Sequence, residues 1–192
     1  MFALVPKQDK VSANLIFLIC IHPCIFKRDS AFSISVLFAG DQDMKEIADE
    51  IRGIVAASTG PLSLMPADRV SFKEKPDKWS KKEILGHLID SAANNHHRFV
   101  RGGCNAAADF PAYNQNDWVR IQKYNESEWK DLVTLWSAYN LHLCHTIERL
   151  SAEALSAPCN IGRGEMVSLE FVIKDYLRHL KHHMEVILEE QG

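Results

Sequence analysis

Apolar side chains recur at steps of three and four residues in four long stretches of this 192-residue chain. That spacing puts them on one side of an α-helix and leaves charged residues on the other, so each stretch predicts an amphipathic helix with one buried face. The pattern therefore predicts an all-α fold with helices over residues 41–58, 80–101, 126–151 and 171–190.

Capping residues mark the starts and ends of these helices. Ser80 and Glu83 form a capping box at the start of the second helix, and a glycine pair at 102–103 follows its end. Asn125 and Glu128 repeat the capping-box pattern. We therefore expect the third helix to start at this pair.

Longer connections separate the predicted helices. Residues 59–77 contain glycine and prolines that break regular helix, with room for a short helical turn. Residues 104–124 are polar with isolated aromatic side chains and predict an irregular connection. Residues 151–158 predict another short helical turn. Residues 160–168 predict a turn whose last residue, Ser168, caps the final helix.

Residues 1–40 differ in character from the rest of the chain. The apolar run 15–26 is too short to span a bilayer, and the β-leaning run 31–40 has no predicted sheet to join. A degenerate signal or membrane anchor, and a strand-like arm that packs on a partner, are two interpretations. We favour a third, in which this extension lies outside a functional domain over 41–192 and Met44 is the first residue of the folded unit.

Charge and cysteine usage narrow the class of protein. The formal net charge is -3 at pH 7 and no basic stripe occurs, which argues against a nucleic-acid partner. Five cysteines form an odd set without a Cys-x-x-Cys pair, which fits neither a disulfide framework nor a thiolate zinc site. Free thiols are typical of a reducing compartment, so we expect a cytoplasmic protein. We expect it to act on a small molecule and to have no membrane partner.

Histidines supply the candidate chemistry. Eight of the nine fall between His87 and His183. His179 and His183 lie four residues apart on the predicted last helix, where Cβ atoms are roughly 5–6 Å apart, so both rings can reach one metal ion. His87, on the second predicted helix, is the candidate third ligand. Two surface histidines are the competing interpretation, and His182 is the alternative ligand if the helix register differs.

The remaining central histidines are weaker ligand candidates. His96 and His97 lie more than two turns beyond His87, too far along one helix to bind the same ion. His142 and His145 are three residues apart and could in principle support a metal. Neither of them has a partner at an equally convenient spacing.

A polar row runs along the second predicted helix from His87 through Asn94 and Arg98. Such a row is either a solvent-facing edge or the lining of a pocket inside the bundle. Asp90, three residues past His87, is the candidate second-shell carboxylate that orients an imidazole, with a solvated acid as the alternative.

Several motifs resemble the DinB/YfiT-like superfamily of four-helix bundles over residues 44–190. They are Trp79–Ser80 before the second helix, the Gly86–Asp90 segment, and the histidine pair in 179–183. The resemblance implies a four-helix bundle with long connections after the first and second helices. Homodimers are common in that family.

The resemblance also implies a divalent metal, zinc or nickel, held by one histidine of the second helix and two of the fourth. These match His87, His179 and His183. Better understood members look like thiol S-transferases or isomerases that use bacillithiol, mycothiol or glutathione, and others are described as metal-dependent hydrolases. The resemblance therefore favours a metal-dependent thiol S-transferase.

Three imidazoles leave the coordination sphere of a divalent ion incomplete, so water or substrate must complete it. The ion can then activate water for hydrolysis or a thiol for transfer. No His-Glu-x-x-His motif occurs, and no residue is identifiable as the catalytic base. Asn94 and Arg98 are the candidate contacts to an anionic thiol. A metal- or ligand-binding stress protein without turnover and a structural bundle with incidental histidines are the alternatives.

Overall fold

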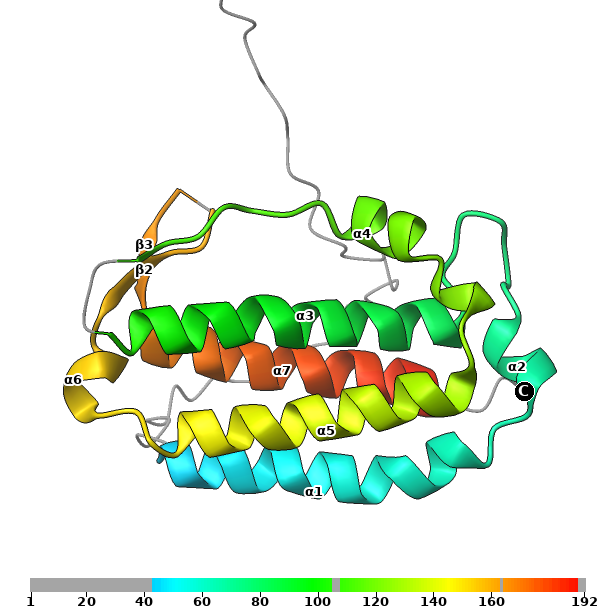
Figure 1. Cartoon of the computed structure of the whole chain (residues 1–192), viewed down its shortest axis with the longest axis horizontal. Helices are drawn as coiled ribbons and strands as arrows, with labels where there is room; N and C mark the ends of the chain where they lie inside the picture. The colour runs from blue at the N-terminus through cyan, green and yellow to red at the C-terminus, as the bar shows by residue number, and fades with distance from the viewer. Residues whose placement is uncertain (1–42, 105–107, 163, 190–192) are drawn as a thin grey trace, which may run out of the picture. The chain divides into compact units, whose positions relative to one another are not determined.

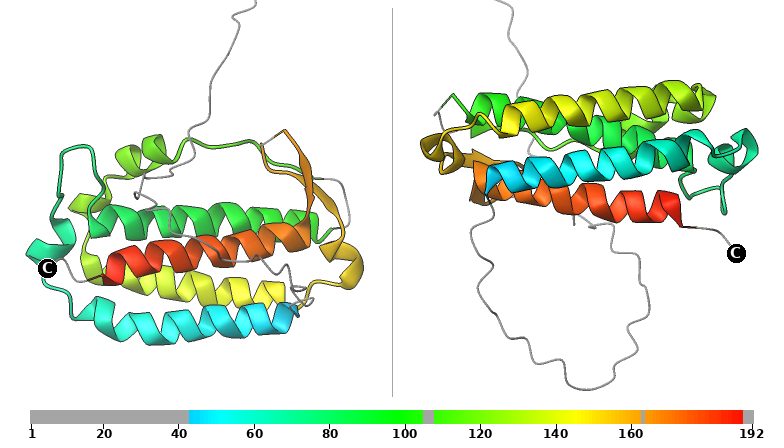
Figure 2. Two further views of the ribbon diagram at one scale, coloured as in Figure 1. Left: turned by 180° about the vertical axis from the view of Figure 1, so that it is seen from behind. Right: turned by 90° about the horizontal axis from the view of Figure 1, so that it is seen from below.

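A ring of contacts joins four long helices around one core. The computed structural model describes residues 43–104, 108–162 and 164–189. The long helices are α1 (Met44–Ser63), α3 (Lys81–Gly102), α5 (Trp129–Ile147) and α7 (Leu169–Leu188). α5 packs against α1 and α3, and α7 packs against the same two helices (Figure 1, Figure 2). The predicted all-α four-helix bundle is confirmed.

Shorter elements occupy the connections between these helices. They are α2 (Ala67–Ser71), β1 (Ala108–Asp109), α4 (Gln115–Gln122), the 3-10 turn η1 (Tyr124–Glu126), α6 (Ala152–Leu155), β2 (Pro158–Asn160) and β3 (Met166–Ser168). β2 pairs parallel with β1 and antiparallel with β3. The predicted short helical turns within 59–77 and 151–158 are confirmed as α2 and α6, whereas the expectation of an irregular connection over 104–124 is wrong at α4. The strands were not predicted, because two or three residues are too short to show a period-two alternation.

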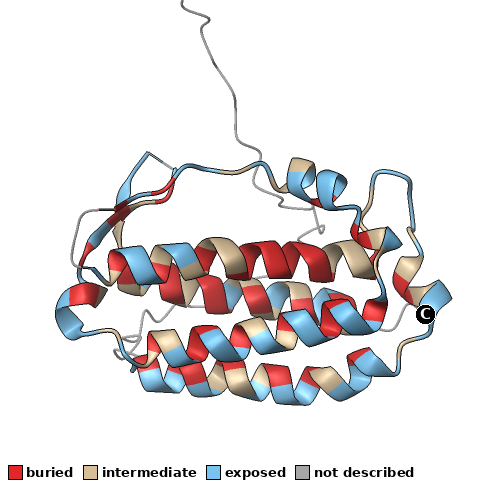
Figure 3. Ribbon diagram, viewed as in Figure 1, coloured by how far each residue is buried: buried red, intermediate tan, exposed pale blue. Residues whose placement is uncertain are grey.

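The apolar stripes of the four long helices face one another (Figure 3). The largest fully buried side chains are Trp136, Phe99, Ile47, Ile51, Leu62, Leu85, Leu88, Leu143, Ile147, Leu169, Ile173 and Leu180. Full burial of one such aliphatic side chain contributes about 1.5–3 kcal/mol. The bundle therefore owes its stability chiefly to these stripes.

One predicted capping box is confirmed and the other is wrong. Ser80 Oγ accepts a hydrogen bond from the Glu83 backbone N–H at 3.2 Å, and Glu83 Oε2 accepts one from the Ser80 N–H at 2.8 Å. α5 begins at Trp129, and Glu128 precedes it without a side-chain cap. Asn125 instead accepts a hydrogen bond from Ser80 Oγ at 2.7 Å, so it ties two connections together.

The first helix is longer than its apolar pattern predicted. α1 continues through Gly60 and Pro61 and ends at Ser63. Pro61 lies in the last turn, where the helix ends two residues later. Met44 is the first residue of α1. Asp43 caps the helix, because its side chain accepts a hydrogen bond from the backbone N–H of Lys45 at 3.3 Å.

The expectations for the extension at 1–40 concern residues that lie outside the described part of the chain. The domain over 41–192 and the start of the folded unit at Met44 therefore stay predictions. Within residues 43–104, 108–162 and 164–189, no helix combines the length and the apolar character needed to cross a membrane.

Candidate metal centre

Three imidazoles, one from α3 and two from α7, converge on one point of the bundle. His87, His179 and His183 each offer a ring nitrogen, and these nitrogens lie within 4.8 Å of one another. The Nε2 atoms of His87 and His179 are 3.1 Å apart. The three ring centroids are 4.5, 4.9 and 5.0 Å apart. In the described part of the chain, no other set of three His, Cys, Asp or Glu side chains converges in this way.

Burial keeps these rings in the form that binds metals. His87 is 2% exposed, and the other two histidines are partly buried. Burial, helped by repulsion between the rings, lowers the pKa of His87 to about 2 and that of His183 to about 3. Both rings are therefore neutral at pH 7, and a neutral ring nitrogen can bind a metal. Nδ1 of His87 is buried without a hydrogen-bond partner among the described residues, which favours a functional histidine.

Two side chains that the sequence did not identify as site residues border the histidines. The ring of Trp79 lies on that of His87, with centroids 5.1 Å apart and an interplanar angle of 41°. Ser91 Oγ lies 3.4 Å from Nδ1 of His179. Ser91 is one helical turn beyond His87, so the helix period was a signal for it. Trp79 precedes the helix, so its signal was instead the Trp79–Ser80 motif of the family resemblance.

The connection before α5 packs directly on α3 beside His87. A Cβ atom on Gly86 would lie 2.1 Å from Cδ2 of Tyr124, so this close approach requires glycine. The Tyr124 hydroxyl donates a hydrogen bond to Asp90 Oδ1 at 2.6 Å, and Gln122 Nε2 donates to the same oxygen at 2.6 Å. Burial raises the pKa of Asp90, and these two hydrogen bonds oppose the rise.

The sequence of this chain matches a known family over most of its length. The model of the DinB superfamily matches residues 44–187. The chain belongs to the DinB superfamily. Among curated proteins, the sequence has no match.

The DinB-type bundle resembles two solved structures. YfiT from Bacillus subtilis is described as a probable metal-dependent hydrolase with an unusual four-helix bundle topology. It superposes with a TM-score of 0.69 at 15% identity, over 85% of this chain and 91% of YfiT. The mycothiol-dependent maleylpyruvate isomerase superposes with a TM-score of 0.64 at 15% identity, over 79% of this chain and 63% of the isomerase. The chain thus spans less than two thirds of the isomerase, and at such identity the likeness shows the shared fold.

Three further α3 residues were predicted to serve the site of this DinB-superfamily protein. Asp90 makes no hydrogen bond with His87 in the described structure, so its orienting role stays a prediction. Asn94 Nδ2 donates a hydrogen bond to the backbone oxygen of Asp90 at 2.9 Å. Arg98 Nη1 donates one to Oδ1 of Asn95 at 3.3 Å. Both predicted cosubstrate contacts are half-buried on α3.

The register of α7 decides between two neighbouring histidines. His183 faces His87 with ring centroids 4.9 Å apart. His182 is exposed, and its ring lies 5.1 Å from that of His183. The alternative ligand His182 is therefore outside the converging group.

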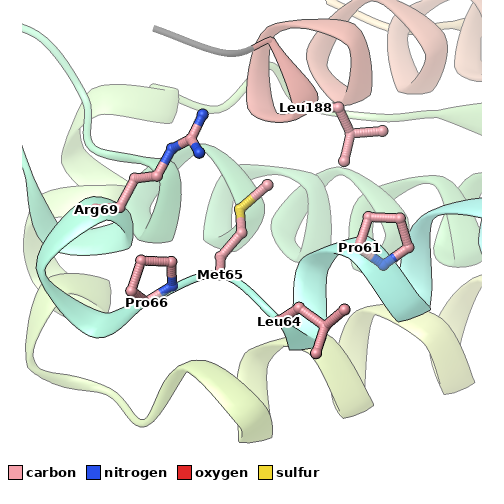
Figure 4. Close-up of a pocket in the computed structure, with 6 residues that line it drawn as sticks. All are labelled: Pro61, Leu64, Met65, Pro66, Arg69 and Leu188. Atoms are coloured by element: carbon pink, nitrogen blue, oxygen red, sulfur yellow. The ribbon is translucent and has the colours of Figure 1, made fainter.

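The described bundle has a smaller and a larger hollow near the ends of its helices α1 and α3. The smaller, of ≈ 220 Å³, contains none of the three histidines and is lined by Pro61, Leu64, Met65, Pro66, Arg69 and Leu188 (Figure 4). The larger, of ≈ 530 Å³, is lined by acidic and basic side chains and by Trp79. The larger hollow also contains none of the three histidines, and Trp79, whose ring lies on that of His87, is the residue that links it to them.

Proposed function

We propose that this DinB-superfamily protein is a divalent-metal-dependent enzyme whose zinc or nickel ion is held by His87, His179 and His183. The observation that carries the proposal is the convergence of three imidazoles from two helices, with no carboxylate or thiol in the group. Such a three-ligand set is typical of catalytic zinc sites, because it leaves a position for water or substrate. Imidazole ligands suit zinc and nickel alike.

The surrounding side chains supply burial and orientation. Since His87 and His183 are neutral at pH 7, neither must lose a proton when an ion binds. Trp79 shields one side of the His87 ring from water, and the Ser91 hydroxyl helps to orient the His179 ring. When bound, a divalent ion would lower the pKa of a thiol or a water molecule at its open position.

Thiol S-transfer onto a small electrophile is the reaction we propose, with a bacillithiol- or glutathione-like thiol as cosubstrate. The chain shares its fold with an isomerase that is named mycothiol-dependent. A transferase needs room for a large polar thiol, and the ≈ 530 Å³ hollow beside Trp79 supplies it, with Lys78 and Arg120 among its charged groups. Asn94 and Arg98 do not line this hollow and are proposed contacts to an anionic cosubstrate because they continue the polar row of His87 along α3.

Hydrolysis is the second candidate, because YfiT shares the fold and is described as a probable metal-dependent hydrolase. A hydrolase needs a general base close to the attacking water. Oδ1 of Asp90 accepts hydrogen bonds from Tyr124 and Gln122, and its buried Oδ2 has no partner among the described residues, so Asp90 is the candidate base for this second reaction. Thiol transfer needs no such base, because a metal-bound thiol is itself the nucleophile.

Metal content and two assays on the untagged full chain test the proposal. We expect the protein as purified to retain one tightly bound metal ion per chain, and to catalyse glutathione- or bacillithiol-dependent conjugation of monochlorobimane. His179→Gln should abolish both, whereas His182→Gln, which removes an exposed histidine of the same helix, should keep both. If the protein hydrolyses an activated ester and does not conjugate the thiol, hydrolysis would replace thiol transfer as the proposed reaction. A metal-loaded protein with neither activity would be a metal- or ligand-binding stress protein, and the enzyme proposal would fall.

Assembly and location complete the proposal. The resemblance to the DinB/YfiT-like family favours a homodimer, and free thiols favour the cytoplasm. Small molecules are the proposed partners, without nucleic acid or membrane. Light scattering on the purified full chain tests the dimer, which a monomeric mass would contradict.

A further inference from the structure

A second group of histidines lies where α3 contacts α5. The rings of His96 and His142 meet edge to face, with centroids 4.9 Å apart and an interplanar angle of 89°. The Tyr139 hydroxyl lies 3.3 Å from Nδ1 of His96. His97 flanks His96 and His145 flanks His142, each with ring centroids 6.4 Å apart. The proposed function uses none of these side chains.

The His96–His142 pair has the spacing of the candidate metal centre. The rings of His87 and His183 also have centroids 4.9 Å apart, at an angle of 73°. A metal ion lies only about 2 Å from each imidazole nitrogen that binds it, so two rings that share an ion must meet at close range. In both pairs the rings lie close enough for this requirement.

The two groups occupy opposite faces of α3. His87 and His96 are nine residues apart, which corresponds to about 13.5 Å along a helix and half a turn around it. The ring of His87 contacts histidines of α7, and the ring of His96 contacts a histidine of α5. The groups therefore share no ligand.

The second group is accessible and includes a neutral ring. His142 is exposed and His96 is half-buried. Burial lowers the pKa of His96, and repulsion from His142 and His97 adds to the effect, so His96 is neutral at pH 7. A neutral imidazole binds a metal without first releasing a proton.

We propose that His96 and His142 form a second, solvent-exposed site for a divalent transition metal that favours imidazole, namely Ni²⁺, Cu²⁺ or Zn²⁺. The site goes beyond the proposed function and does not depend on it. Both ligands project from long helices that pack together, so they are preorganised for chelation. With two protein ligands and water in the remaining positions, the site binds its ion more weakly than the three-histidine group does.

Equilibrium dialysis of the untagged full chain against Ni²⁺ tests this site. We expect the wild-type protein to bind two ions per chain. His96→Gln and His142→Gln should each weaken the second ion by about 100-fold or more, because one ring cannot chelate. His182→Gln, the matched removal of an exposed helical histidine outside the pair, should keep both ions.

A double variant, His87→Gln with His179→Gln, separates the two proposals. It should lose the tighter ion and retain the ion that His142→Gln loses. Circular dichroism reports whether this variant folds, and the two single variants of the second site carry the test if it does not.

A wild-type protein that binds one ion, and loses that ion in the double variant, would overturn the second site. Second-ion affinity unchanged in both His96→Gln and His142→Gln would overturn it as well. One ion that only His96→Gln and His142→Gln lose would instead refute the three-histidine centre and leave the second site standing.

Discussion

Two groups of histidines on opposite faces of α3 have similar ring spacing and differ in burial. The centroids are 4.9 Å apart between His87 and His183 and also between His96 and His142. His87 is 2% exposed, whereas His142 is exposed. Helix packing alone can thus bring imidazoles within reach of one ion. Burial decides whether an ion can act in a site from which water is largely excluded, where its electrostatic effects are stronger.

The third ring is the other difference between the groups. His179 and His183, four residues apart on α7, meet at 70° with centroids 4.5 Å apart. His142 and His145, three residues apart on α5, are nearly parallel at 13° with centroids 6.4 Å apart. Among the described residues, no converging group of three metal-binding side chains includes His142 or His145. The α7 pair therefore completes a three-ligand group, and the α5 pair does not.

Replacing a ligand of the buried group should have the largest effect on metal binding. We expect His87→Gln to weaken zinc binding by on the order of 100-fold or more, because residues that only orient ligands already contribute about 10–100-fold. Competition with a chromogenic chelator measures the change. His142→Gln is the control and should leave the tight zinc ion unaffected. Equal zinc affinity in His87→Gln and wild type would remove the distinction between the groups.

Acidification should destabilise the metal-free protein through the buried group. The folded-state pKa values of about 2 for His87 and about 3 for His183 lie below the ordinary 6.5, so the unfolded chain binds more protons below pH 6.5. The free energy of unfolding should fall as the pH decreases from about 6.5 towards these values, by up to about 1.4 kcal/mol per pH unit for each histidine.

Urea denaturation in the presence of a chelator, between pH 7.5 and pH 5, measures this dependence. His87→Gln with His183→Gln removes both depressed groups and should flatten the curve. His142→Gln is the matched change in the exposed group and should keep the wild-type slope. An equal slope in all three proteins would contradict the prediction.

Crowding beside the buried group should make Gly86→Ala costly. The added Cβ would lie 2.1 Å from a carbon of the Tyr124 ring, so the connection before α5 must shift. We expect a loss of about 1–3 kcal/mol in the free energy of unfolding. Gly53→Ala in α1 is the control, because its Cβ would meet nothing within 4 Å. That change should stabilise the protein by about 0.5–1 kcal/mol, and similar effects at both glycines would refute the packing argument.

Removal of one tyrosine hydroxyl in each region compares the two groups through a single hydrogen bond each. Tyr124→Phe removes a buried donor to Asp90 and should cost about 1–3 kcal/mol. Tyr139→Phe removes a 3.3 Å contact with His96 near the surface and should cost about 0.5 kcal/mol or less. Denaturant titration of both variants measures the difference. A larger loss for Tyr139→Phe would reverse the ranking of the two regions.

Local patterns predicted most of the helices and part of the site. The apolar stripe and the His179–His183 spacing depend only on the helix period, so both could be read along the chain. His87 required a further step, because its helix is distant in the sequence. His87 was the candidate from its own helical stretch, the resemblance to the DinB/YfiT-like family matched it, and the structure brings the three rings together.

Contacts between residues that lie far apart in the sequence were predicted wrongly or not at all. Asn125 and Glu128 have the spacing of a capping box, but Asn125 accepts a hydrogen bond from Ser80, and α5 starts after Glu128. Nothing in the sequence indicated that Tyr124 packs on Gly86. Such contacts depend on how connections cross the helices, which no short window of sequence contains.

The sequence by itself determined four amphipathic helices and the histidines that share a face of one helix. Only the tertiary structure decided that α3 presents His87 to α7 and His96 to α5. The physical reason is that spacing along a helix follows from local backbone geometry, whereas the rotation of one helix against another is set by side-chain packing over the whole core.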